Sequence, residues 1–114
     1  MTNPLVKRNT PLSEQIYAAH IEWAAAQRDF HILESQRTVV KQRKITEQLD
    51  LKAARTETAA KRLVEGSEWY QDYLRELVEA EYTALNARGK WEYLQEAAKE
   101  SRDASFQERL MAKI

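Results

Sequence analysis

The residues of this chain that could do chemistry are its charged side chains and two histidines, and they form no familiar catalytic or metal-binding pattern. The chain has 114 residues, with 18 Asp and Glu, 18 Lys and Arg, 2 His and no Cys. The lack of Cys excludes disulfides, thiolate zinc sites and cysteine nucleophiles. A di-iron helical bundle needs Glu three residues before each His, but Tyr17 and Arg28 stand three residues before His20 and His31. We therefore expect no enzyme activity, no metal, no cofactor and no small-molecule substrate.

The charged residues are unevenly distributed, although the net charge of the chain is zero. Residues 37–62, the basic block, carry eight basic and three acidic side chains, whereas residues 65–81, the acidic block, carry six acidic side chains and only Arg75 as a base. The basic side chains are Arg37, Lys41, Arg43, Lys44, Lys52, Arg55, Lys61 and Arg62. Clustered cations bind nucleic-acid phosphates by releasing counterions, and the nearby Trp69 and Tyr70 could stack on bases of a single strand. A solvated helix face with packed aromatic residues explains the same pattern.

The rest of the composition is typical of long helices that position these residues. Only 2 Gly and 2 Pro are present, and both prolines precede residue 12, which argues strongly against an all-β fold. We expect a flexible arm at 1–10 and a single helical hairpin domain at 11–114. No apolar run approaches the roughly 20 residues that span a membrane, and residues 1–10 do not resemble a signal peptide. A cytoplasmic location is therefore expected.

A regular apolar stripe runs along residues 12–40 and predicts a coiled-coil-like helix. Its members follow at alternating steps of four and three: Leu12, Ile16, Ala19, Trp23, Ala26, Phe30, Leu33, Arg37 and Val40. Such spacing keeps one side of a helix against a partner helix. Only Arg37 interrupts this first stripe. We predict one helix from about residue 11 to about residue 63, with a kink or fraying near 55–58, where Arg-Thr-Glu-Thr is a weak helix former.

A turn at Gly66 should separate this helix from a second one. Gly66 could adopt the left-handed conformation that ends a helix, and Ser67 could cap the next helix. The second helix has its own stripe, at Tyr73, Leu77, Ala80, Ala84, Ala87, Trp91, Leu94 and Ala98. Leu74, Val78 and Leu85 would widen this second stripe. Phe106, Leu110 and Ile114 suggest a short C-terminal helix.

Reversal of the chain at Gly66 would make an antiparallel hairpin with a defined pairing. Val40 would then lie near Trp91, and Leu33 near Ala98. The second stripe would be used up before the first helix reaches its beginning, leaving an apolar face there without a partner. Its residues are Leu12, Ile16, Ala19, Trp23, Ala26 and Phe30. We therefore predict that they mediate self-association into a homo-oligomeric bundle or ring.

The order of these features resembles a known family. A heptad helix leads to the run Ala-Arg-Thr-Glu-Thr-Ala-Ala-Lys-Arg at 54–62 and, after a break, to Ser-Glu-Trp-Tyr-Gln-Asp-Tyr-Leu-Arg-Glu-Leu-Val-Glu-Ala-Glu at 67–81. A helix with Leu85, Arg88 and Trp91 follows. This pattern, over residues 12–103, resembles small phage proteins of the UvsY-like recombination mediator type.

The resemblance implies an oligomeric helical protein that binds single-stranded DNA. Such a mediator helps to load a recombinase on DNA covered by single-strand-binding protein, so both proteins become expected partners. Basic positions 41–62 would contact DNA, and the location would be the host cytoplasm if a phage encodes the chain. The alternative is a helical protein-interaction module, such as a phage inhibitor of a host defence complex or a coiled-coil adaptor. In that case the acidic block would be the functional surface.

Overall fold

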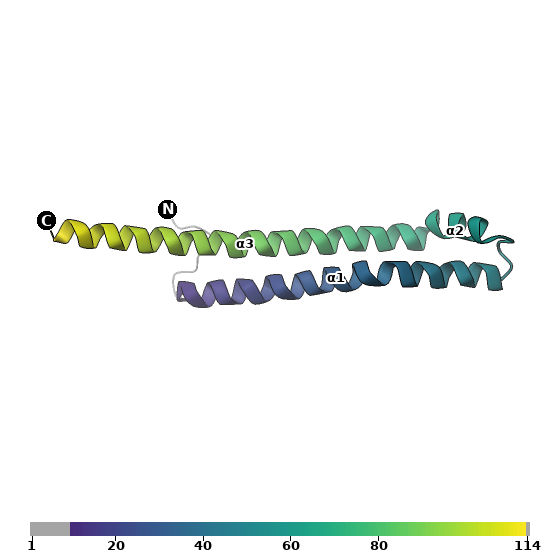
Figure 1. Ribbon diagram of the computed structural model, residues 1–114, viewed down its shortest axis with the longest axis horizontal. Helices are drawn as coiled ribbons and strands as arrows, with labels where there is room; N and C mark the ends of the chain where they lie inside the picture. Colours follow the sequence, from purple (N-terminus) through teal and green to yellow (C-terminus); the bar gives the residue numbers. More distant parts are fainter. Residues whose placement is uncertain (1–9, 114) are drawn as a thin grey trace. The chain divides into compact units, whose positions relative to one another are not determined.

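The described chain is built of helices and their connections (Figure 1). A computed structural model describes residues 10–113, so the predicted arm at 1–10 lies outside the described residues except for Thr10. Three helices follow in order: α1 (Leu12–Asp50), α2 (Glu57–Glu65) and α3 (Glu68–Ala112). The prediction of an all-α fold is confirmed for this part of the chain.

The described residues fall into two compact units. The first unit contains residues 10–26, with the beginning of α1, and residues 83–113, with the second part of α3. The second unit contains residues 27–82, with the rest of α1, all of α2 and the first part of α3. Within each unit, the segments of α1 and α3 pack side by side in opposite directions (Figure 1). The predicted antiparallel pairing of two long helices is therefore confirmed.

The first helix ends earlier than the sequence predicted. α1 stops at Asp50, so the prediction of one helix to about residue 63 is wrong. Lys52 has a φ of 56°, its N–H donates to the Leu49 carbonyl, and the Ala53 N–H donates to the Gln48 carbonyl. This pair of hydrogen bonds around a left-handed residue is a Schellman motif, which normally has Gly at the left-handed position. Here a lysine occupies that position.

A short helix follows the reversal of the chain direction. The Thr56 side chain accepts a hydrogen bond from the Ala59 N–H at 3.1 Å, and this cap begins α2. Gly66 ends α2 at a φ of −85° and a ψ of −5°, so its predicted left-handed conformation is wrong. Ser67 accepts from the Tyr70 N–H at 3.2 Å, as expected of a residue that caps α3. The chain therefore reverses at residues 51–56, and not at Gly66.

The early reversal changes which residues face each other. In the first unit, the Trp23 and Trp91 rings stack with centroids 4.9 Å apart, and Lys90 forms an ion pair with Glu22 at 3.2 Å. In the second unit, the Tyr73 hydroxyl donates to the Leu33 carbonyl at 2.5 Å. The predicted pairings of Val40 with Trp91 and of Leu33 with Ala98 are wrong. Because the chain reverses at residues 51–56, α2 packs against the last part of α1, and α3 packs against earlier residues of α1 than predicted.

Both predicted apolar stripes face the helix interfaces. Every member of the second stripe is buried or half-buried, and so is every member of the first stripe except the exposed Arg37. In the second unit a small core forms where α1, α2 and α3 meet, and it contains Ile45, Ala60, Val64 and Tyr70. The expected widening of the second stripe is only partly correct. Leu74 packs against this core, but Val78 and Leu85 are 65 % and 58 % exposed.

The last helix continues to the end of the described chain. α3 runs without a break to Ala112, so the prediction of a separate C-terminal helix is wrong, and the short helix of this fold is α2. Residues 99–113 are all exposed. Ile114 lies outside the described residues. Within residues 10–113, no helix is both long enough and apolar enough to cross a membrane.

Candidate nucleic-acid interface

The basic block lies entirely in the second unit and is divided among three elements. Arg37, Lys41, Arg43 and Lys44 belong to α1, Lys52 and Arg55 to the connection, and Lys61 and Arg62 to α2. Because the chain reverses within this block, its cations lie on both sides of the reversal. The sequence predicted the charges, but it did not predict that they would surround one end of a hairpin.

Three of the eight cations are held by neighbouring side chains. The Lys41 ammonium lies 2.8 Å from a Glu65 carboxylate oxygen and 5.2 Å from the centre of the Tyr70 ring. The Lys61 ammonium approaches the same Glu65 oxygen at 3.9 Å. The Lys44 ammonium lies 3.7 Å from Glu47 and 5.1 Å from the centre of the Trp69 ring. Lys41, Lys44 and Lys61, the tied cations, therefore have partners that a phosphate would have to displace.

The pairing of Lys41 with Glu65 also affects their proton affinities. The hydrogen bond from Lys41 holds the pKa of the Glu65 carboxyl below its usual value, and the same bond raises the pKa of the Lys41 ammonium. Partial burial opposes both shifts. The ion pair joins α1 to the end of α2, so it contributes to the hairpin structure as well as to the charge of the surface.

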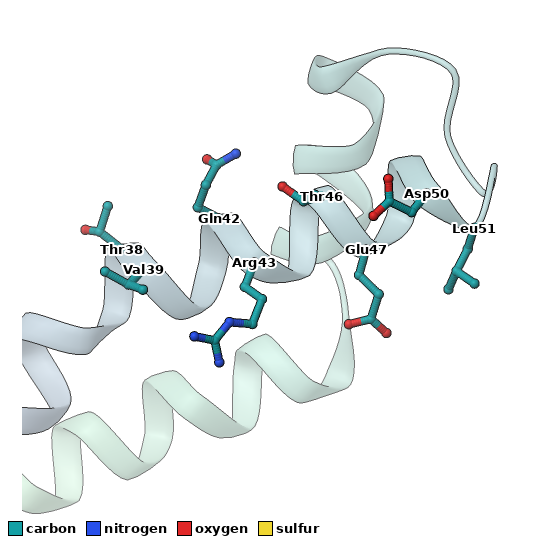
Figure 2. Close-up of a pocket in the computed structure, with 8 residues that line it drawn as sticks. All are labelled: Thr38, Val39, Gln42, Arg43, Thr46, Glu47, Asp50 and Leu51. Atoms are coloured by element: carbon teal, nitrogen blue, oxygen red, sulfur yellow. The ribbon is translucent and has the colours of Figure 1, made fainter.

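The other five cations are exposed, and within the described residues their side chains form no ion pair or hydrogen bond. These free cations are Arg37, Arg43, Lys52, Arg55 and Arg62. Arg43 projects from the same side of α1 as Glu47, whereas Thr38 and Gln42 project from the other side (Figure 2). All eight residues drawn there come from α1 or its immediate end, so this is an open helix face and no enclosed cavity. The free cations are available to an anionic partner.

Two shallow hollows are lined by five of the eight cations, two of them tied and three of them free. One lies between α1 and α2 and is lined by Arg37, Lys41 and Lys61, with Glu57 as the only acidic residue of its wall. The other lies at the connection and α2, where Arg55 and Arg62 line it together with Thr56. Neither arrangement has the geometry of a catalytic site. Both can hold phosphate oxygens through charge and hydrogen bonding.

The predicted base-stacking residues belong to the core of this unit. Tyr70 is only 6 % exposed and packs with Ile45, Ala60 and Val64. Trp69 is half-buried against this core. The Tyr70 ring is therefore buried in this structure, and its stacking on DNA stays a prediction. Charge, rather than aromatic stacking, is what the surface offers.

The predicted oligomerisation residues have partners within the chain. Ala19 is 2 % exposed, and Leu12, Ile16, Trp23, Ala26 and Phe30 are half-buried. In the first unit, Trp23 packs against Trp91 and His20, and the Arg88 guanidinium lies 5.9 Å from the centre of the Trp23 ring. The premise that this face lacks an intramolecular partner is therefore wrong. Self-association through these residues stays a prediction.

The histidines and acidic residues form no metal site in the described part of the chain. There, no group of three or more His, Asp or Glu side chains is arranged to hold an ion. His20 contacts the rings of Trp23 and Trp91, and His31 lies against Phe30.

The sequence reading missed one surface, on the side of α3 that carries Val78 and Leu85. These residues follow the spacing of a separate exposed stripe, which a search for a second periodic pattern on the same helix would have found.

Comparison of the chain with protein families, with curated proteins and with solved structures finds no match. The chain's own residues therefore carry the functional proposal.

Proposed function

We propose that this protein binds single-stranded DNA through the basic block of its second unit and acts as a non-enzymatic accessory protein of phage recombination. The observation that carries the proposal is the set of five free cations at one end of a hairpin. An exposed cation without an internal partner loses little when it binds a phosphate, and it releases counterions from the nucleic acid.

The distribution of the cations favours a flexible strand. Arg43 lies on an open face of α1, whereas Arg55 and Arg62 line a hollow at the connection and α2. A single strand can bend to follow cations on different elements, but a DNA duplex is stiff over the few turns that a protein of this size can contact. Binding should therefore be stronger to single-stranded DNA and largely independent of sequence, because phosphate contacts carry no base information.

The role in recombination rests on the resemblance to UvsY-like mediators. In that role the protein would help a recombinase to replace single-strand-binding protein on DNA. Accessory action of this kind needs no catalytic group, and it requires only binding surfaces for the strand and for the partner proteins. The basic block supplies the first of these surfaces.

Two triple variants test the proposal directly. Substitution of Arg43, Arg55 and Arg62 by Ala removes three free cations, and it should weaken single-strand binding and flatten its salt dependence. With a slope of about 0.7 per phosphate contact for single strands, loss of three contacts should reduce the slope by about 2. The measurement is fluorescence anisotropy of a labelled oligonucleotide at several salt concentrations.

The matched control removes the same charge from exposed residues outside the basic block. Lys99, Arg102 and Arg109 are exposed on α3 in the first unit, and their substitution by Ala should leave the salt slope unchanged. Equal losses of affinity for single-stranded DNA in the two triple variants would show that binding depends only on net charge. Unchanged affinity in the variant of the basic block would remove this surface from the proposal.

A protein-interaction module is the second candidate, and the acidic block favours it. In the second unit, α3 exposes Glu68, Asp72, Glu76 and Glu81. Such a row could dock on a basic protein or imitate the charge of DNA. Preference for a basic protein over DNA, lost when Glu76 and Glu81 are changed to Gln, would favour this candidate.

A further inference from the structure

The Glu65 carboxylate at the end of α2 is shared by two lysines from different helices. Its Oε1 atom lies 2.8 Å from the ammonium of Lys41 on α1 and 3.9 Å from the ammonium of Lys61 on α2. All three residues belong to the second unit. An anionic oxygen held by ammonium groups is also the arrangement in which lysines bind a phosphate. Glu65 therefore occupies charges that a nucleic-acid phosphate would use.

The same two lysines line the hollow between α1 and α2. This hollow has a volume of about 290 Å³, and the free cation Arg37 lines it together with Lys41 and Lys61. Glu65 does not belong to its wall, whose only acidic residue is Glu57. A phosphate that enters the hollow would meet the ammonium groups that Glu65 holds from outside. It would therefore compete with Glu65 for their charge.

Helix stability does not explain an acidic residue at this position. Glu65 is the last residue of α2, where the helix dipole disfavours a negative charge. Attachment of α2 to α1 does not depend on Glu65 alone, because Ala60 and Val64 of α2 pack in a buried apolar core with Ile45 of α1. The distinctive effect of the Glu65 side chain is to neutralise part of the charge of its two lysines.

We infer that Glu65 is an internal competitor of DNA phosphate, which holds Lys41 and Lys61 in the free protein and is displaced when a strand binds in the hollow. The inference rests on the proposed function, because it concerns the regulation of the same basic block. It implies that the wild-type protein binds a strand less tightly than its eight basic side chains would allow.

The exposure of the contacts permits such an exchange. The side chains of Lys41, Lys61 and Glu65 are 21 %, 57 % and 42 % exposed. Water reaches these ion pairs and screens them, so a phosphate can replace the carboxylate without leaving a buried charge unpaired. Lys41 keeps a second contact after the exchange, because its ammonium lies 5.2 Å from the centre of the Tyr70 ring.

Glu65→Gln tests the inference, because Gln has the shape of Glu without its charge. Binding is measured by fluorescence anisotropy of a labelled single-stranded oligonucleotide. It should become about two- to tenfold tighter than in the wild type, the range expected when one or two exposed ion pairs no longer compete. With about 0.7 per phosphate contact, two additional contacts should make the salt slope steeper by up to about 1.4.

Glu68→Gln is the matched control for net charge. Glu68 is exposed in the same unit, three residues further along the chain, and it forms no ion pair within the described residues. This variant should leave the salt slope unchanged and should bind the strand less tightly than Glu65→Gln. Glu65→Asp keeps the charge but moves the carboxylate away from Lys41, because its side chain is shorter. It should also bind the strand more tightly than the wild type.

A double-mutant cycle shows whether Glu65 acts through its two lysines. In a chain that carries Lys41→Ala and Lys61→Ala, Glu65→Gln should strengthen binding no more than Glu68→Gln does. An equal gain from Glu65→Gln with and without the lysines would indicate general repulsion of DNA and overturn the inference. Circular dichroism of every variant should match the wild type, because the apolar core is unchanged.

Failure of this inference and failure of the DNA-binding role give different results. If the wild type and Glu65→Gln bind the strand equally tightly with equal salt slopes, the DNA-binding role stands and Glu65 is no competitor. If neither protein binds the strand at low salt, the DNA-binding role of the basic block fails, and the inference fails with it. Tighter binding by Glu65→Gln than by both the wild type and Glu68→Gln supports the inference.

Discussion

Replacement of Lys52 by Gly should stabilise the protein. Lys52 adopts a φ of 56° in the motif that ends α1, and a left-handed conformation costs an L-amino acid about 1–2 kcal/mol. Gly avoids this cost because it has no Cβ. It also has more freedom in the unfolded chain, which offsets about 0.5–1 kcal/mol of the gain. The net stabilisation should therefore be about 0.5–1 kcal/mol.

Lys52→Ala is the matched control for this prediction. Both substitutions remove the exposed lysine side chain, but Ala keeps the Cβ atom and therefore keeps the cost of the left-handed conformation. In urea denaturation, Lys52→Gly should have a higher free energy of unfolding than the wild type, and Lys52→Ala should have nearly the same value as the wild type. In a thermal scan the gain corresponds to roughly 2–6 °C for a chain of this size.

One result would contradict the predicted stabilisation by Lys52→Gly. If Lys52→Gly is no more stable than Lys52→Ala, the residue is not held in the left-handed conformation. The reversal of the chain at residues 51–56 would then need another explanation. Equal losses in both variants would point to the lysine side chain, and not to the backbone, as the stabilising feature.

Three further changes probe other parts of the structure. Gly89→Ala should raise the free energy of unfolding by about 1 kcal/mol. Gly66→Ala should give no such gain, because its new Cβ would lie 3.3 Å from the Arg62 carbonyl oxygen. Urea denaturation of the two variants measures the difference. Tyr73→Phe should cost about 0.5–1.5 kcal/mol in the same assay through the lost hydrogen bond. Burial raises the pKa of the Tyr73 phenol, so its contribution is complete below its ordinary pKa of about 10. It is lost as pH rises through the folded value, and Tyr73→Phe should lack this alkaline loss of stability in denaturation between pH 8 and 11.

Periodicity was sufficient to predict the helix interfaces of this fold. The steps of four and three placed Ala19 and Trp23 on the buried side of α1, and Ala84, Ala87 and Leu94 on the buried side of α3. These positions are determined by helix geometry and apolar burial, both of which are local properties of the sequence. The all-helical class followed from the scarcity of Gly and Pro.

The position of the chain reversal was harder to predict, because the residue that ends α1 is unusual. The left-handed position of a Schellman motif is commonly Gly, and the sequence offered Gly66 as the obvious candidate. Lys52 takes that conformation instead. The only local sign of the break was the weak helix former Arg-Thr-Glu-Thr, in which Thr56 caps α2.

One misplaced turn altered the predicted interface as well. A reversal at Gly66 leaves Trp23 without a partner and therefore predicts self-association through residues 12–30. With the reversal at residues 51–56, Trp91 stacks on Trp23. Val78 and Leu85 were expected to widen the buried face of α3, since each lies one position beyond a residue of the second stripe, but both are exposed. Apolar type alone does not distinguish these two surfaces.

The charges of the basic block could be read from the sequence, but their availability could not. Lys41 and Arg43 are two residues apart, yet one is held by Glu65 and the other is free. That difference depends on which helix packs nearby. It matters for function because only cations without strong internal partners bind phosphates at little cost.

The most direct test of the central proposal is a titration of labelled single-stranded DNA with the wild-type protein at low and moderate salt, followed by anisotropy. Duplex DNA of the same length is the control. Tighter binding to the single strand, with a steep fall in affinity as salt increases, is the predicted result. Absence of binding to either form at low salt would contradict the DNA-binding role of the basic block.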